Sequence, residues 1–137
     1  MTPADIRLLQ EVYRREYRSL LQYSRDAACY TPLADRPIRD GIARIANADA
    51  AEIDAFGERM DAHRVSLPHL GSFPVGYTDL NFVTVRHLLP KLVSEQNGDI
   101  GKLDADAAAC TDVVARAAIQ RLVDVHKRHL KELGRLG

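Results

Sequence analysis

The sequence lacks most features that mark a secreted, membrane or nucleic-acid-binding protein. Its two cysteines, Cys29 and Cys110, lie far apart without Cys-x-x-Cys spacing, which argues against a disulfide framework or a zinc ribbon. Neither sign of charge is in excess, since 19 Lys and Arg balance 19 Asp and Glu, so no surplus of positive charge favours nucleic acid or an anionic lipid surface. No stretch approaches the roughly 20 uncharged residues of a membrane helix. We therefore expect a cytoplasmic protein with no nucleic-acid and no membrane partner.

The sequence has little β-strand signal. β-branched residues are scattered, and no stretch alternates apolar and polar residues over the length of a strand. The chain has 137 residues, of which 46% are hydrophobic and 28% charged, which is typical of one folded domain. The sequence therefore predicts a single all-α domain.

Capping residues and prolines divide the chain into four predicted helices. Thr2 and Pro3 form a helix start, and Thr31-Pro32 ends that helix. Pro90 and Gly98 fall inside the third helix, where we expect a bend and not a break. The predicted helices cover residues 3–29, 37–63, 79–107 and 111–133.

The connections between these helices predict the topology. Two are short, which favours antiparallel neighbours, whereas residues 64–78 form a link of about 15 residues that can span up to about 50 Å. We therefore expect a four-helix bundle with one long crossover between helices 2 and 3, which would place Cys29 and Cys110 at opposite ends. An up-down-up-down bundle with an overlong loop is the alternative. Apolar side chains in the link predict packing against the helices or a second subunit, hence a homodimer or higher homo-oligomer.

Polar residues interrupt the apolar seam of each predicted helix at mid-height. In the third helix two lines of residues at helical spacing are almost equally apolar. One passes through Val85, Leu88 and Leu92 and reaches Glu95, and the other reaches Gln96. A buried carboxylate without a partner costs several kcal/mol, so four of them in one bundle centre imply a cation. Carboxylates and imidazoles suit iron, manganese and zinc. The predicted metal ligands are Glu16, Asp49, Glu52, Glu95, His126 and His129.

Three segments carry a family resemblance: Glu16-Tyr17 followed by Leu20 and Tyr23, the stretch 45–56, and the stretch 122–133. They resemble the ligand helices of the ferritin-like superfamily, particularly its small rubrerythrin-like members. The resemblance implies a dinuclear iron or manganese centre with a ferroxidase or peroxide- or oxygen-reacting role.

The sequence departs from the family pattern, which is Glu-x-x-His on helices 2 and 4. Asp49 stands where the family has Glu, Glu52 where it has His, and His126 where it has Glu, while His129 matches. The first alternative is therefore a metal-free bundle with a structural or interaction role, in which the same polar residues pair with arginines. The second is a ligand-binding bundle whose link 64–78 covers an apolar pocket.

Overall fold

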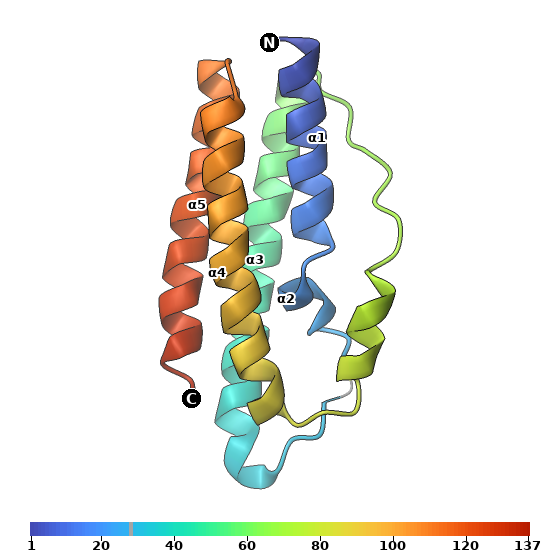
Figure 1. Cartoon of the computed structure of the whole chain (residues 1–137), viewed down its shortest axis with the longest axis vertical. Coiled ribbons are helices and arrows are strands. Elements are labelled where there is room, and N and C mark those ends of the chain that lie inside the picture. Colours follow the sequence, from blue (N-terminus) through green and yellow to red (C-terminus); the bar gives the residue numbers. More distant parts are fainter. Residues whose placement is uncertain (28) are drawn as a thin grey trace.

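The computed structural model describes residues 1–27 and 29–137, and within them it contains helices but no β-strand. This confirms the predicted all-α class. Figure 1 shows the long helices lying side by side. The helices are α1 (Pro3–Tyr17), α2 (Leu20–Tyr23), α3 (Arg36–Ala62), α4 (Val85–Ala109) and α5 (Val113–Gly134), with short 3-10 helices η1 (Leu33–Asp35) and η2 (Val75–Leu80).

The path of the chain contains one long crossover. Helices α1 and α3 run in opposite directions, as do α4 and α5, whereas α3 and α4 run in the same direction (Figure 1). The segment between α3 and α4 therefore travels along the length of the molecule. Cys110 directly follows α4 at one end, and Tyr30, next to Cys29, bonds to the backbone of Val83 and Val85 at the start of α4, toward the other end. Both thiols are free.

The first helix is shorter than predicted. Helix α1 ends at Tyr17, and Ser19 adopts an extended backbone conformation with its hydroxyl accepting a hydrogen bond of 3.2 Å from the backbone of Gln22. A serine in this conformation starts a new helix, α2, instead of continuing the old one. The predicted continuation to residue 29 is wrong for the described residues, and Ala28 lies outside them.

Helix α4 starts later than predicted. Residues 75–80 form η2, and Thr84 caps α4 by accepting a hydrogen bond of 3.2 Å from the backbone of His87. Backbone bonds of 3.1 Å between Tyr30 and both Val83 and Val85 flank Thr84, which is held in an extended conformation directly before the helix. The helix is continuous through Pro90. Helices α3 and α5 begin and end within two residues of the predicted bounds.

The hydrophobic core consists of two clusters that occupy different levels of the molecule. One contains Leu9, Ile53, Leu103 and Leu122, and the other contains Leu20, Ile45, Leu92 and Leu133. Along each long helix, residues of one cluster are followed by residues of the other after a short interval. The interval runs from Tyr13 to Leu20 in α1 and α2, from Ala46 to Ile53 in α3, from Leu92 to Ile100 in α4 and from Val123 to Leu133 in α5. The five titratable residues of the centre described below lie in these intervals.

The crossover packs against the helices in part. Phe73 stacks edge-on against Tyr23 with ring centroids 5.3 Å apart, and Arg14 donates a hydrogen bond of 3.1 Å to the carbonyl of His69. Leu67 and Val75 remain exposed. The homodimer therefore stays a prediction.

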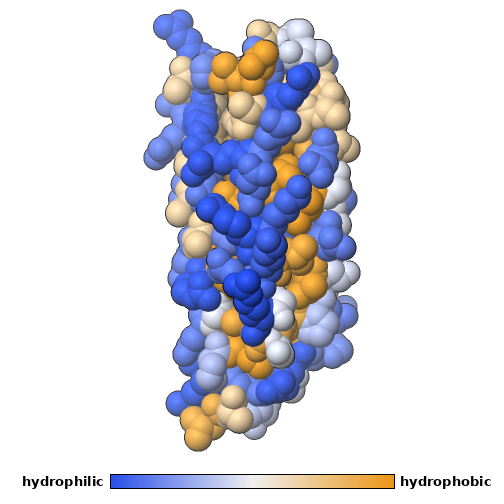
Figure 2. Space-filling view, turned by 90° about the vertical axis from the view of Figure 1, so that its left-hand side faces the viewer, coloured by the Kyte–Doolittle hydropathy of each residue, from blue (hydrophilic) through white to orange (hydrophobic). Residues whose placement is uncertain are grey.

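The surface on the side of α5 is mainly hydrophilic, with hydrophobic side chains visible along the length of the molecule (Figure 2). Within the part of the chain that the structure describes, no helix is both long and apolar enough to cross a membrane.

Candidate metal centre

Five titratable side chains from four helices meet between the two core clusters. They are Glu16 on α1, Asp49 on α3, Asp99 on α4, and His126 and His129 on α5. Four of them are almost completely buried, with 1% of Glu16, 1% of Asp49, 2% of His126 and 5% of His129 exposed. Such groups are rarely buried unless they are paired or bind a metal.

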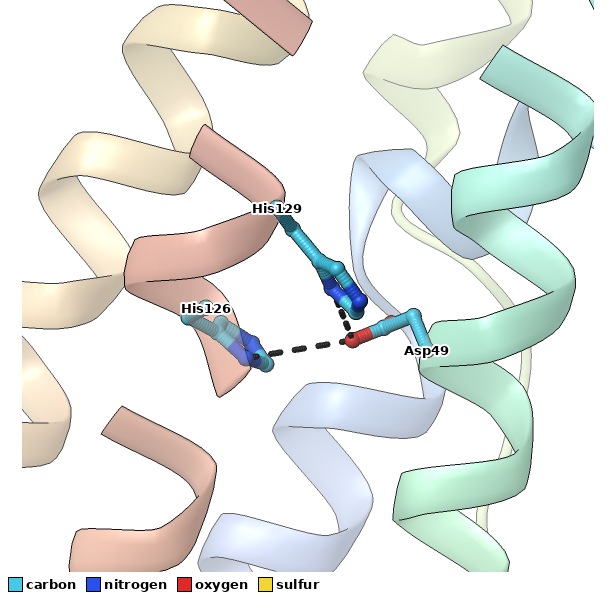
Figure 3. Close-up of side chains that lie close together, drawn as sticks. All are labelled: Asp49, His126 and His129. Carbon is cyan, nitrogen blue, oxygen red and sulfur yellow. Dashed lines mark ion pairs between the residues drawn. The ribbon is translucent and has the colours of Figure 1, made fainter. Parts of the chain in front are cut away.

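The first group consists of Asp49, His126 and His129. Oδ1 of Asp49 lies 3.8 Å from Nδ1 of His126 and 3.6 Å from Nδ1 of His129, so α3 and α5 present these atoms to one another (Figure 3). All three atoms are buried and none has a hydrogen-bond partner among the described residues. The distances are too long for direct hydrogen bonds, which leaves room for an atom between them.

The second group surrounds the other nitrogen of His126. Nε2 of His126 lies 2.8 Å from Oε2 of Glu16 and 3.1 Å from Oδ2 of Asp99. Nε of Arg15 lies 3.5 Å from Glu16 and 3.3 Å from Asp99, and its Nη2 lies 2.7 Å from Asp106. The two ring nitrogens of His126 therefore face two different environments.

Two glutamines from neighbouring helices contact the centre. The side-chain amide of Gln22 on α2 donates to Oδ2 of Asp49 over 2.8 Å and to the carbonyl of Ala46 over 3.0 Å. Gln96 on α4 donates to the carbonyl of His126 over 3.4 Å. These bonds occupy one oxygen of Asp49 and leave Oδ1 directed at the two imidazoles.

The electrostatics of the buried groups follow from their contacts. Burial raises the pKa of Glu16 to about 8, although the hydrogen bond with His126 opposes the change. Burial favours a neutral His126, but the contacts with Asp99 and Glu16 outweigh it and raise the pKa of His126 to about 10. Burial also opposes ionisation of Asp99, yet its contacts with His126 and Glu16 hold the pKa of Asp99 below its usual value. In the metal-free chain His126 is therefore an imidazolium at neutral pH.

The first group fits a divalent transition-metal ion. Bond lengths of about 2.0 to 2.2 Å place neighbouring ligand atoms about 3 to 3.5 Å apart, slightly closer than the distances found here. When His126 loses its proton to become a ligand and Glu16 ionises, the carboxylates of Glu16, Asp49 and Asp99 face the guanidinium of Arg15, and a divalent cation would offset the negative charge that the released protons leave behind. A carboxylate on the far nitrogen of a ligating histidine is the usual way to orient such a ligand.

Four of the six sequence-predicted ligands meet in the centre, and two do not. Glu16, Asp49, His126 and His129 lie together. Glu52 lies on the flank of α3, where both of its oxygens bond to Arg121 over 3.3 Å. Glu95 is exposed on α4.

Asp99 and Gln22 contact the centre but are not among the predicted ligands. In α4 the buried residues follow the second of the two predicted lines, which passes through Leu92 and Gln96. Gln96 is 5% exposed, and Asp99 is the next polar residue on that line, three positions later. Following that line further would have found Asp99. The inward position of Gln22 depends on the interruption after α1, for which Ser19 was the only signal.

Comparisons with protein-family models, with curated proteins and with solved structures gave no match to this chain.

Proposed function

We propose that this chain is a ferritin-like four-helix bundle that binds iron or manganese at Asp49, His126 and His129. The observation that carries the proposal is the convergence of three buried, unpaired ligand atoms, Asp49 Oδ1, His126 Nδ1 and His129 Nδ1. The chain direction with one long crossover supports the ferritin-like assignment, as does the position of the polar centre at mid-height of the helices.

The donor set suggests the chemistry. Two imidazoles and one carboxylate with open coordination positions are the ligands of many non-haem iron(II) sites that react with dioxygen. A metal ion held in this way supplies a Lewis acid and an electron donor or acceptor. The proposed role is therefore an oxidoreductase reacting with oxygen or peroxide, or a ferroxidase. The residues of this chain exclude bulk water, fix the imidazoles and hold the proton on Nε2 of His126.

The arrangement favours one ion over the two that the family resemblance implies. Both candidate ligand groups use His126, so two ions would have to share one imidazole. In a one-ion arrangement Nδ1 of His126 would hold the metal, and Glu16 and Asp99, which lie next to Nε2, would accept the proton of that nitrogen. Glu52 and Glu95, which would complete a six-ligand dinuclear set, lie outside the centre.

Metal titration of chelator-treated protein tests the proposal. We expect one equivalent of Mn(II), or of Fe(II) without oxygen, per chain by calorimetry and elemental analysis. Asp49→Asn and His129→Gln should each weaken binding by at least about 100-fold, because each removes a ligand and not only a supporting contact. Glu52→Gln and Glu95→Gln are matched controls that should bind normally. Two equivalents, with loss in all four variants, would instead support a dinuclear centre.

The second candidate function is a metal-free structural or interaction protein. The ion pairs of His126 with Glu16 and Asp99, and of Arg15 with Asp99 and Asp106, favour it because they partly satisfy the buried charges without a cation. Absence of binding by either metal at millimolar concentration in a folded, fully reduced sample would support this candidate and exclude the metal centre.

A further inference from the structure

A cleft of about 550 Å³ opens between α1, α2 and α4. Tyr77 of η2 and Pro74 of the crossover border it, and Asp99 is among the residues that line it. The volume lies within the range of about 300 to 1,000 Å³ that small-molecule sites occupy. The crossover therefore borders a pocket large enough for a small organic molecule.

One part of the cleft is apolar. Leu20, Leu21 and Leu92 line it, and all three belong to the buried core. Tyr77 adds a half-buried aromatic ring from the crossover. Burial and the nearby carboxylates of Glu95 and Asp99 raise the pKa of Tyr77, so its phenol stays a neutral hydrogen-bond donor. The leucines are only 2 to 3% exposed, so the hydrocarbon part of a ligand would contact their edges and the ring of Tyr77.

Some of the charged side chains that line the cleft form ion pairs within the described chain, and others do not. Arg14 pairs with Glu11 over 2.7 Å, and Arg15 pairs with Asp99 over 3.3 Å. Among the described residues, Arg18, Lys102 and Glu95 form no ion pair. Nε of Arg18 is moreover buried without a hydrogen-bond partner. The cations of Arg18 and Lys102 and the carboxylate of Glu95 are therefore available to contact a ligand. Nε of Arg18 is a hydrogen-bond donor that has no acceptor among the described residues.

We propose that this cleft binds a small organic carboxylate, held at its charged end by Arg18 and Lys102, with its apolar body against Tyr77 and the exposed edges of the leucines. A guanidinium offers parallel donors to a carboxylate, and such charge-assisted bonds are stronger than neutral ones. An inorganic anion would satisfy the cations but leave the leucine side unfilled. The carboxylate therefore fits both parts of the lining.

The proposal goes beyond the metal centre and does not depend on it. Asp99 belongs to both places, because it lines the cleft and contacts His126. A ligand in the cleft would lie next to the centre, separated from it by this carboxylate. The binding test uses the metal-free chain, so failure of metal binding and failure of carboxylate binding are observed separately.

Hexanoate is the probe, and its uncharged analogue hexanamide and inorganic phosphate are the controls. Backbone amide shifts in two-dimensional NMR spectra of the metal-free full chain locate and quantify binding. We expect hexanoate to shift residues lining the cleft and to bind at least about tenfold more tightly than either control. Equal binding of hexanamide, equal binding of phosphate, or shifts outside the cleft would overturn the proposal.

Charge-removing variants test the assigned cations. Arg18→Gln and Lys102→Gln should each weaken hexanoate binding by about tenfold or more, whereas Arg7→Gln on α1 and Lys91→Gln on α4, both exposed outside the cleft, should not. Glu95→Gln should bind hexanoate more tightly, because it removes a like charge. If Arg18→Gln fails to fold, the affinities of Lys102→Gln and Glu95→Gln for hexanoate provide the test. Unchanged affinity in both of these variants would refute the assignment.

Discussion

Gln22 holds Asp49 in place by donating a hydrogen bond of 2.8 Å from its side-chain amide to Oδ2 of the carboxylate. The same amide nitrogen is fixed by the carbonyl of Ala46, 3.0 Å away. The bond joins the short helix α2 to α3 inside the protein and leaves Oδ1 of Asp49 for the two imidazoles. Gln22 is therefore a positioning residue of the proposed metal centre.

Gln22→Leu should reduce metal affinity by about 10- to 100-fold, which is the usual effect of losing an outer-shell partner. The physical reason is that Oδ2 of Asp49 loses its donor, so the carboxylate can rotate away from the imidazoles. Competition with a chelator of known affinity measures the change. Gln120→Leu, at an exposed position of α5, is the control. Equal affinities for the two variants would show that Gln22 does not orient Asp49.

Metal binding should release protons and strengthen as the pH rises. The contacts with Asp99 and Glu16 raise the pKa of His126 to about 10 in the metal-free chain, so its Nδ1 carries a proton that a metal must displace. Near pH 7 we expect release of about one proton per ion, or more if Glu16, with a pKa of about 8, also ionises. Calorimetry in buffers of different ionisation heat counts the protons. Affinity that is independent of pH would contradict binding through His126.

Asp5 should make the fold sensitive to acid. Its carboxylate accepts hydrogen bonds from the hydroxyl of Thr111 over 2.7 Å and from the backbone of Thr111 over 2.9 Å, which lower the pKa of Asp5 well below its usual range. The folded-state pKa lies below the unfolded value, so the stabilisation is complete above about pH 4 and is lost as the pH falls toward the folded pKa.

Asp5→Asn tests this linkage. The variant should melt at a lower temperature than the natural chain at pH 6, and the difference between the two should shrink as the pH falls toward 3. Circular dichroism at several pH values measures both melting temperatures. Asp104→Asn, at an exposed position of α4, is the control and should follow the natural chain. A constant difference across the pH range would exclude Asp5 as the acid-sensitive group.

Two glycines inside helices should respond to alanine in opposite directions. A Cβ at Gly57 would lie 2.8 Å from Cε2 of Tyr13, which is buried, so Gly57→Ala should destabilise the fold by about 1 to 3 kcal/mol through overpacking. A Cβ at Gly98 would meet nothing within 4 Å, so Gly98→Ala should stabilise α4 by about 0.5 to 1 kcal/mol. Urea denaturation gives both values. Stabilisation by both substitutions would mean that Tyr13 moves freely.

The sequence was sufficient for features that depend on local chemistry and periodicity. The all-α class follows from the lack of strand-like alternation, the start of α3 from Pro37 in its first turn, and the start of α5 from the cap at Asp112. Four central residues, Glu16, Asp49, His126 and His129, could be identified because polar residues in an apolar seam must find partners. These features are each determined by residues close together in the chain.

Features set by tertiary contacts could not be predicted. Glu52 and Glu95 lie next to the apolar seams of their helices, and a rotation of either helix decides whether they face inward. Packing turns Glu52 toward Arg121 on α5 and places Gln96 instead of Glu95 in the core. The late start of α4 likewise depends on Tyr30, a residue more than 50 positions away in the chain.

The interruption at Ser19 has a geometric consequence for the centre. In an uninterrupted helix, with about 100° of rotation per residue, Glu16 and Gln22 would point in directions about 120° apart, and both could not serve the same interior point. Because α1 stops at Tyr17 and α2 restarts at Leu20, the angular phase is reset, and both side chains converge on the imidazole–carboxylate layer. The polar layer built by α1, α3, α4 and α5 thereby gains a contact from a fifth helical segment, α2, that an uninterrupted helix could not supply.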